Sequence, residues 1–125
     1  MDWYKLGFAS VVGAVLGAAG VQGLHAQAKR PAYLVIEVDV TDADLYKQYT
    51  SKAGPLQSQY SARFIAQGGR VDAFAGEPPK RAVIAVFDNL EKAQALRDSD
   101  EYKELIAVRD KASKYRGYII EGAAN

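Results

Sequence analysis

The run R-A-V-I-A-V-F, residues 81–87, restricts the fold of this chain more than any other stretch. Successive side chains of an extended strand point to opposite faces, so this run presents apolar side chains on both faces. Such a strand belongs inside a sheet that is covered on both sides. Helices of the same chain can form one cover, and we expect the other to be a second copy of the sheet, related by a two-fold axis.

The stretch before this strand predicts a strand, a helix and a further extended segment. Residues 33–40 read as a strand in which polar residues alternate with apolar ones toward the end. Asp42 supplies an N-cap for a helix over about 42–52. Pro55 follows a glycine, and the pair predicts that this helix ends and that a second short helical piece reaches Tyr60.

Residues 62–76 read as strand on both sides of Gly68-Gly69. The two glycines predict either a two-residue hairpin turn or a bulge that bends one long strand. Two prolines and a glycine make residues 76–80 a turn that leads into the strand at 81–87.

The last third of the chain predicts a helix in two pieces and a final strand. One piece covers about 90–97 after a cap at Asp88-Asn89, and the next begins at Ser99 or Asp100. Residues 115–122 read as the last strand. The order β-α-β-β-α-β predicts an α+β, ferredoxin-like fold, in which an antiparallel sheet has its helices on one face.

Residues 6–28 contain no Asp, Glu, Lys or Arg, and their apolar part is too short and too rich in small residues for a typical membrane-spanning helix. The stretch ends in A-Q-A at 26–28, which resembles the cleavage site of a secretory signal peptide. We expect residues 1–28 to be a signal peptide and 29–125 to form one exported domain in the periplasm. The alternative is an uncleaved anchor that holds the domain outside the membrane.

The expected domain contains neither histidine nor cysteine, because the single histidine is His25 of the leader. This composition excludes thiolate and imidazole metal ligands, a haem held by histidine, and the catalytic triads that use these residues. We expect neither a metal nor a cofactor, and acid-base chemistry would depend on Asp, Glu, Lys or Tyr. The formal net charge of +1 gives no field that attracts nucleic acid or an anionic membrane.

Several stretches together resemble the domain-of-unknown-function family 1330 across about 32–122. They are V-D-V-T-D (38–42), R-F-I-A-Q-G-G-R-V (63–71), S-D-E-Y (99–102), Arg109 and I-I-E-G (119–122). The chain departs from the family pattern at Ala95-Leu96, where larger aromatic residues are frequent, and at Asp100, where proline is frequent. The first departure would alter a cavity wall, and the second only the start of a helix.

The resemblance implies a dimeric α+β barrel in which a cavity lies between the sheet and the helices. It implies no established activity. Relatives with that architecture include cofactor-free monooxygenases, lactone isomerases and haem-dependent enzymes. The absence of histidine from the expected domain disfavours an enzyme.

Arg109 is the most informative candidate for a binding residue. It falls on the same helical face as Tyr102, Leu105 and Ile106. A guanidinium on an apolar face requires an anionic or carbonyl partner, unless its charged end reaches the rim of the domain. The partner would be either an anionic ligand or a carboxylate of the sheet. The candidate carboxylates are those of Glu37, Asp39 and Glu121.

Four other residues are candidates for binding a ligand at the same cavity: Arg63, Tyr102, Tyr49 and Ser99. Each has a structural alternative. An arginine on a strand can face solvent, tyrosines suit half-buried packing, and a serine before a helix is usually an N-cap. No residue is identified as catalytic.

Three functions fit these observations. The domain is expected to be a homodimer that binds a small apolar or anionic molecule. One alternative is a cofactor-independent oxygenase or isomerase, in which Tyr or Asp acts as base and Arg109 stabilises an anion. The other is a purely structural dimer. An unfilled cavity that contains Arg109 would favour binding, and a filled one would favour the structural dimer.

We predict that the exported protein is cleaved after Ala28. The charge-free stretch 6–28 and its small-residue end are the reason. The intact mass of protein recovered from the periplasm measures this directly. A species that keeps residues 1–28 would contradict cleavage and support the anchor.

Overall fold

A computed structural model describes residues 30–124, so the expected leader and its cleavage site lie outside the described residues. The elements in chain order are β1 (Ala32–Val40), α2 (Ala43–Gln59), β2 (Arg63–Gln67), β3 (Arg81–Phe87), α3 (Leu90–Asp98), α4 (Asp100–Ala112) and β4 (Ser113–Glu121). The predicted order β-α-β-β-α-β is confirmed, as is the division of the second helix into two pieces.

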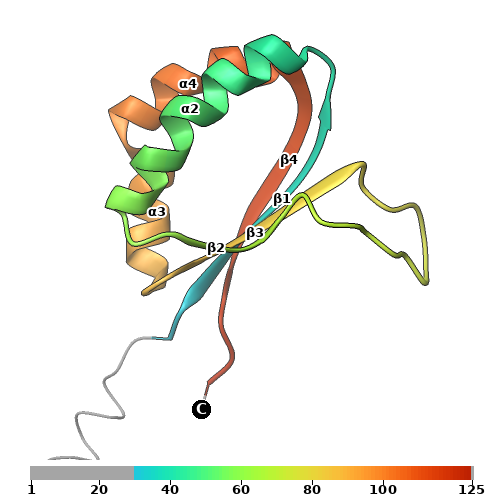
Figure 1. Ribbon diagram of the computed structural model, residues 1–125. Helices are drawn as coiled ribbons and strands as arrows, with labels where there is room; N and C mark the ends of the chain where they lie inside the picture. Colours follow the sequence, from blue (N-terminus) through green and yellow to red (C-terminus); the bar gives the residue numbers. More distant parts are fainter. Residues whose placement is uncertain (1–29, 125) are drawn as a thin grey trace, which may run out of the picture.

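The four strands form one antiparallel sheet in the order β2-β3-β1-β4. All three helices cover the same face of this sheet (Figure 1). The arrangement is the ferredoxin-like α+β fold that the sequence predicts. Among residues 30–124, no helix is long and apolar enough to cross a membrane.

The core lies between the helices and the covered face of the sheet. Phe87 of β3 is its largest fully buried side chain, at 1% exposed, and Leu96 and Tyr102 pack there from α3 and α4. Directly opposite residues of antiparallel strands share a face, so the pairing of Leu34 with Ala85 and with Ile119 places all three on the core side.

The other face of the sheet is also largely apolar. Val35 of β1 stands opposite Ile84 of β3 and Tyr118 of β4, and these pairs point away from the helices. We call this surface the open face and define it by six residues: Tyr33, Val35, Ile84, Val86, Tyr118 and Ile120. Two of its members remain well exposed, Tyr118 at 44% and Ile120 at 54%. The expectation that β3 is apolar on both faces is confirmed.

The prediction that α2 ends before Pro55 is wrong. The helix runs without interruption from Ala43 to Gln59, although Pro55 removes one backbone donor. Tyr49, Ala53 and Gln57 are buried at intervals of four residues on both sides of the proline. The helix continues because this buried stripe requires it on both sides, and tertiary packing overrides the local preference of proline.

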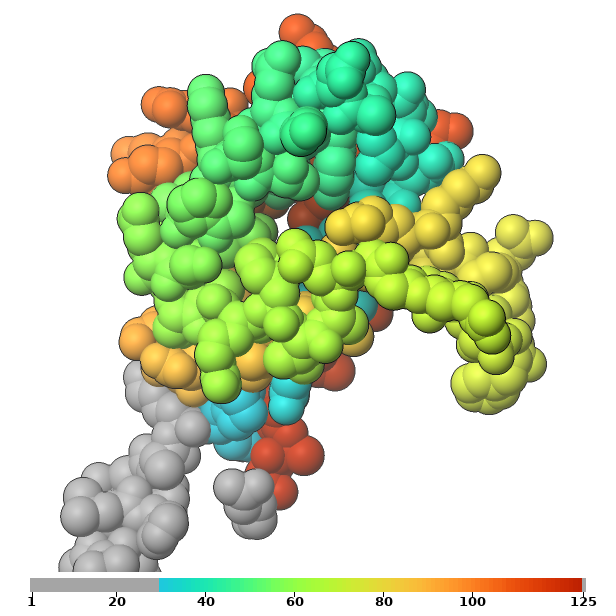
Figure 2. Space-filling view, in the orientation of Figure 1, coloured from blue at the N-terminus to red at the C-terminus, as the bar shows by residue number. Residues whose placement is uncertain are grey.

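The prediction of strand on both sides of Gly68-Gly69 is half wrong. β2 ends at Gln67, and its bulge lies earlier, between Phe64 and Ala66. Gly68 takes a positive φ of 72°, which a residue without Cβ adopts freely. Residues 68–80 then leave the sheet as an extended arm that stands away from the body (Figures 1 and 2). Phe74 in this arm is fully exposed.

The expected helix caps are present where the sequence places them. The Asp42 carboxylate accepts from the backbone N–H of Leu45 at 3.1 Å, and Asn89 accepts from Lys92 at 2.9 Å. Ser99 stands at the junction between α3 and α4. Its Oγ accepts from the N–H of Tyr102 at 3.2 Å and donates to the carbonyl of Leu96 at 2.8 Å.

We predict that Ser99→Ala lowers the free energy of unfolding by about 1 kcal/mol, because α4 loses its N-cap. Ser99→Asp retains an acceptor for the first turn of α4 and should recover most of this loss. Urea denaturation of the two variants and the wild type measures the difference. Equal stability of all three proteins would show that the cap contributes nothing.

Candidate functional site

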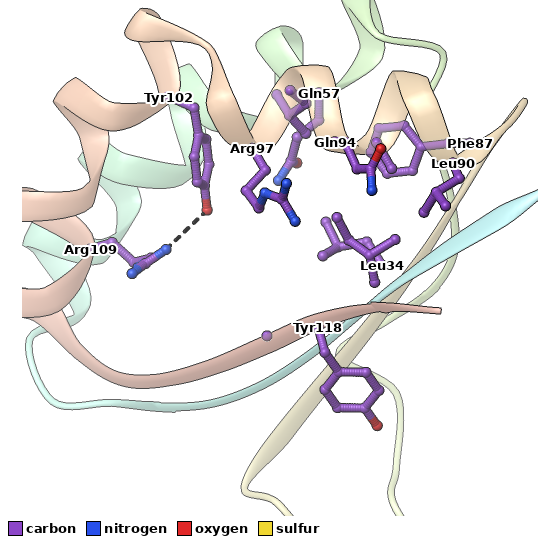
Figure 3. A pocket seen from close by; sticks show the side chains of 13 residues that line it. Leu34, Gln57, Phe87, Leu90, Gln94, Arg97, Tyr102, Arg109 and Tyr118 are labelled. Atoms are coloured by element: carbon purple, nitrogen blue, oxygen red, sulfur yellow. Dashed lines mark hydrogen bonds between the residues drawn. The ribbon is translucent and has the colours of Figure 1, made fainter. Parts of the chain in front are cut away.

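A cavity of about 350 Å³ lies between the sheet and the helices (Figure 3). Leu34, Gly117 and Ile119 line it from the sheet, and α3 contributes Leu90 and Leu96. The volume is within the range of small-molecule sites, which is about 300–1,000 Å³. The cavity that the family resemblance implies is therefore present in this chain.

One end of the cavity is polar and carries a positive charge. Arg109 Nη1 donates to the hydroxyl oxygen of Tyr102 at 3.3 Å, and both residues line the cavity. The Arg109 guanidinium also lies over the ring of Tyr115, 4.3 Å from its centroid. This cation–π contact and the hydrogen bond fix the guanidinium, whose side chain is only 18% exposed.

The carboxylate partner expected for Arg109 is not one of the sheet acids. Its Nε donates to Asp110 at 3.0 Å, and the Asp110 side chain is 56% exposed. Glu37 instead pairs with Arg116 on the open face, and Glu121 pairs with Arg30. Asp39 stands opposite Lys114, which is also on the open face, so the pleat of the sheet directs it away from Arg109.

Arg109 remains a cation in the folded protein. Burial lowers its pKa, but hydrogen bonds to Tyr102 and Asp110 and their charges raise it, and the net shift is upward. The cavity therefore keeps a positive charge near neutral pH.

Tyr49, Tyr102 and Tyr115 pack against one another beside Arg109. The hydroxyls of Tyr49 and Tyr102 are 2.8 Å apart, and the ring of Tyr49 meets that of Tyr115 edge-on with centroids separated by 6.3 Å. Burial raises the pKa of both Tyr49 and Tyr115 well above the usual range of a phenol. These two phenols are therefore neutral near pH 7 and unsuited to act as general bases.

The five residues predicted from the sequence fall in different places. Tyr102 and Arg109 line the cavity. Tyr49 does not line it, but its hydroxyl contacts that of Tyr102. Ser99 is occupied as a cap between two helices. Arg63 is exposed on the edge strand β2, opposite Val86, and so projects from the open face rather than into the cavity.

Three polar residues of the cavity were not predicted: Gln57, Gln94 and Arg97. Arg97 lies at the rim, where it donates two hydrogen bonds to the neighbouring Asp98 at 2.9 and 3.1 Å. Gln57 differs, because it is only 4% exposed and comes from the buried stripe of α2. Its spacing of eight residues from Tyr49 and four from Ala53 is the sequence signal that could have identified it.

The site combines apolar walls with hydrogen-bond donors. Its walls are apolar, its donors are a guanidinium, amides and a phenol, and no acidic residue of the described chain lines it. Within residues 30–124, no group of His, Cys, Asp or Glu side chains is placed to hold a metal ion. The arrangement suits an apolar molecule that carries an anionic or hydrogen-bonding group.

Comparison with solved structures supports the fold. RPA0582, a protein of unknown function from Rhodopseudomonas palustris, is 15% identical with a TM-score of 0.62, and the match covers 85% of this chain and 94% of that chain. SnoaB, a cofactor-independent oxygenase from Streptomyces nogalater, is 6% identical with a TM-score of 0.51, and the match covers 77% and 96%. At these identities the likeness concerns the fold alone.

A third structural relative is a dimeric ferredoxin-like protein of unknown function from Thermobifida fusca YX. It is 14% identical with a TM-score of 0.51, and the match covers 74% of this chain and 92% of that chain. A search of curated proteins gave no match to this sequence.

The sequence model of the family described as "Domain of unknown function (DUF1330)" matches residues 31–123. The match includes every strand and helix of the described fold, and it includes the cavity with Arg109 and Tyr102. This chain therefore belongs to the DUF1330 family.

Proposed function

We propose that this domain is exported to the periplasm and binds a small apolar or anionic molecule in its cavity as a homodimer. The observation that carries the proposal is the cavity of about 350 Å³ with a fixed guanidinium at one end. Part of the space between the sheet and the helices is left open by the side chains that line it, which disfavours a purely structural role.

Arg109 can bind an anion without first losing its present contacts. Nε donates to Asp110 and Nη1 donates to Tyr102, whereas Nη2 donates to no acceptor within residues 30–124. Arginine offers five N–H donors in a planar fork, so donors remain for a carboxylate. Because Asp110 is more than half exposed, its negative charge is screened by water and leaves the cavity end attractive to anions.

A cofactor-independent oxygenase or isomerase is the second candidate function. The fold likeness to SnoaB supports it, but only at the level of the fold. The cavity offers Arg109 as an anion stabiliser, yet no carboxylate lines it and Tyr49 and Tyr115 stay protonated near pH 7. Without a general base of matched pKa, binding is the better supported function.

Homodimerisation is proposed from the open face of the sheet. Its members come from three strands, and Tyr118 and Ile120 are about half exposed. A contiguous apolar surface of this kind is uncommon on monomeric proteins and usually marks an interface. The relative from Thermobifida fusca is described as dimeric, which is consistent with pairing of two such sheets.

We predict that Arg109→Met abolishes the binding of small carboxylates and changes the stability of the empty protein little. A hydrogen-bonded ion pair contributes about 1.5–3 kcal/mol, so affinity should fall at least tenfold. Titration calorimetry with benzoate and hexanoate measures affinity, and thermal melts measure stability. Arg97→Met is the matched control, because Arg97 lies at the rim and is already paired with Asp98.

Two results would contradict this prediction. Equal carboxylate affinity in the wild type and Arg109→Met would show that Arg109 does not bind the ligand. A large fall in the melting temperature of the empty Arg109→Met protein would show that the guanidinium holds the tyrosine cluster together.

We predict that the wild type sediments as a dimer at micromolar concentration and that Ile120→Glu converts it to a monomer. A charge introduced at this apolar position would be desolvated in the interface without a partner. Lys114→Glu is the control, because Lys114 shares strand β4 and its open side with Ile120 but lies at the polar end. A wild type that sediments only as a monomer would refute dimerisation through the open face.

A further inference from the structure

We infer that the ligand is a ring-containing carboxylic acid that also carries a hydroxyl or carbonyl group, and that this second group hydrogen-bonds to the side chain of Gln57. The inference rests on the proposed function, because it takes the carboxylate to bind at Arg109. It extends that function by naming the class of ligand and the residue that selects it.

The side-chain amide of Gln57 is buried and has no hydrogen-bond partner among residues 30–124. The residue is 4% exposed, and its side chain makes no hydrogen bond with any other described residue, although its backbone carbonyl accepts from Tyr60 and Ala62. A side-chain amide has two donors and two acceptor lone pairs. Leaving such a group unpaired in the interior is costly, so a buried glutamine in this state requires an explanation.

The amide faces the cavity rather than the packed core. Among the described residues, no polar side-chain atom that is fully enclosed lacks a hydrogen-bond partner. The unpaired amide of Gln57 must therefore retain some contact with open space, and Gln57 is among the residues that line the cavity. In Figure 3 its amide extends from α2 toward Leu34 on the floor.

The position of Gln57 within the cavity defines where the second polar group of the ligand lies. Figure 3 shows Tyr102 and Arg109 at one end, Phe87 and Leu90 toward the other, and Gln57 between them. If the carboxylate of a ligand binds Arg109, the middle of the ligand lies beside Gln57 and its apolar end contacts Phe87. Its hydrogen-bonding group must therefore be attached partway along an otherwise apolar body.

The floor of the cavity favours a flat ring. Gly117 lies there on β4, opposite Ile36, so one position of the floor carries no side chain. A glycine inside a strand permits the close approach of a ligand to the backbone. Leu34 and Ile119 flank this position with apolar surface. A planar ring can lie across this floor with one edge against Tyr115, whose Cε1 is 3.2 Å from the position that a Cβ on Gly117 would take.

A bound water offers a competing explanation for Gln57. A second hollow of about 60 Å³ reaches Gln57 from the other side, where it is lined by Tyr46, Tyr49 and Arg81 among others. A water there would have polar partners and would satisfy the amide. In that case Gln57 would be structural, and its replacement would not alter the choice of ligand.

The test compares the binding of benzoate with that of 2-, 3- and 4-hydroxybenzoate and 4-formylbenzoate by titration calorimetry. We expect at least one substituted acid to bind the wild type about tenfold more tightly than benzoate, in line with one net hydrogen bond in a buried site. Gln57→Leu should abolish that preference while benzoate affinity stays unchanged. Gln48→Leu is the matched control, because Gln48 lies on the same helix but is exposed and does not line the cavity.

The melting temperature of the empty protein gives an independent readout. Leucine is close to glutamine in size and leaves no amide unpaired, so Gln57→Leu should melt at a higher temperature than the wild type. A structural glutamine held by a water would give a lower one. Gln57→Met, which keeps the unbranched shape, serves as a second variant in case Gln57→Leu fails to fold.

The outcomes separate this inference from the proposed function. If benzoate binds through Arg109 but no substituted acid binds more tightly, or if the preference survives in Gln57→Leu and Gln57→Met, the inference is wrong and the proposed function stands. If no acid binds the wild type, both are wrong. A preference that is lost in both Gln57 variants and kept in Gln48→Leu supports the inference.

Discussion

The contact between the Tyr49 and Tyr102 hydroxyls joins α2 to α4 above the sheet, and the cavity depends on it. The rings of these two residues and of Tyr115 meet edge-on and hold the helices away from the strands. Ala93 of α3 and Gly117 of β4 are the two small residues of the cavity wall, and each leaves room beside its larger neighbours. Arg109 binds to the same tyrosine cluster, which couples the position of the charge to the packing that creates the cavity.

The charge of the site is positive because the acidic side chains of the sheet point away from the cavity. Glu37 and Asp39 alternate with core residues on β1 and so project from the open face. The helix supplies Asp110 beside Arg109, but that carboxylate is largely in water. Among the described residues, the cavity is lined by two arginines and neutral polar groups and by no carboxylate, a combination that would stabilise an anion.

The elements predicted correctly are those that a few neighbouring residues define, such as an apolar strand or a helix cap. β3 was predicted with the observed bounds, and the caps at Asp42, Asn89 and Ser99 mark the helix starts that were expected. The errors arose where tertiary packing decided the outcome. Pro55 was taken as a break, but α2 continues because its buried face spans the proline. That single error hid Gln57, since a broken helix gives no reason to place it on the same face as Tyr49.

The sheet order has a consequence for how this domain can vary. The arm of residues 68–80 connects β2 to β3 at one edge, whereas β4, which lines the cavity, forms the opposite edge. The arm enters β3 at Arg81, whereas β3 reaches the cavity at its other end, through Phe87. Changes in the length or sequence of the arm should leave the cavity walls untouched, because an exposed connection adds little to the core. The arm and the cavity can therefore vary independently in this fold, one at each end of the same strand.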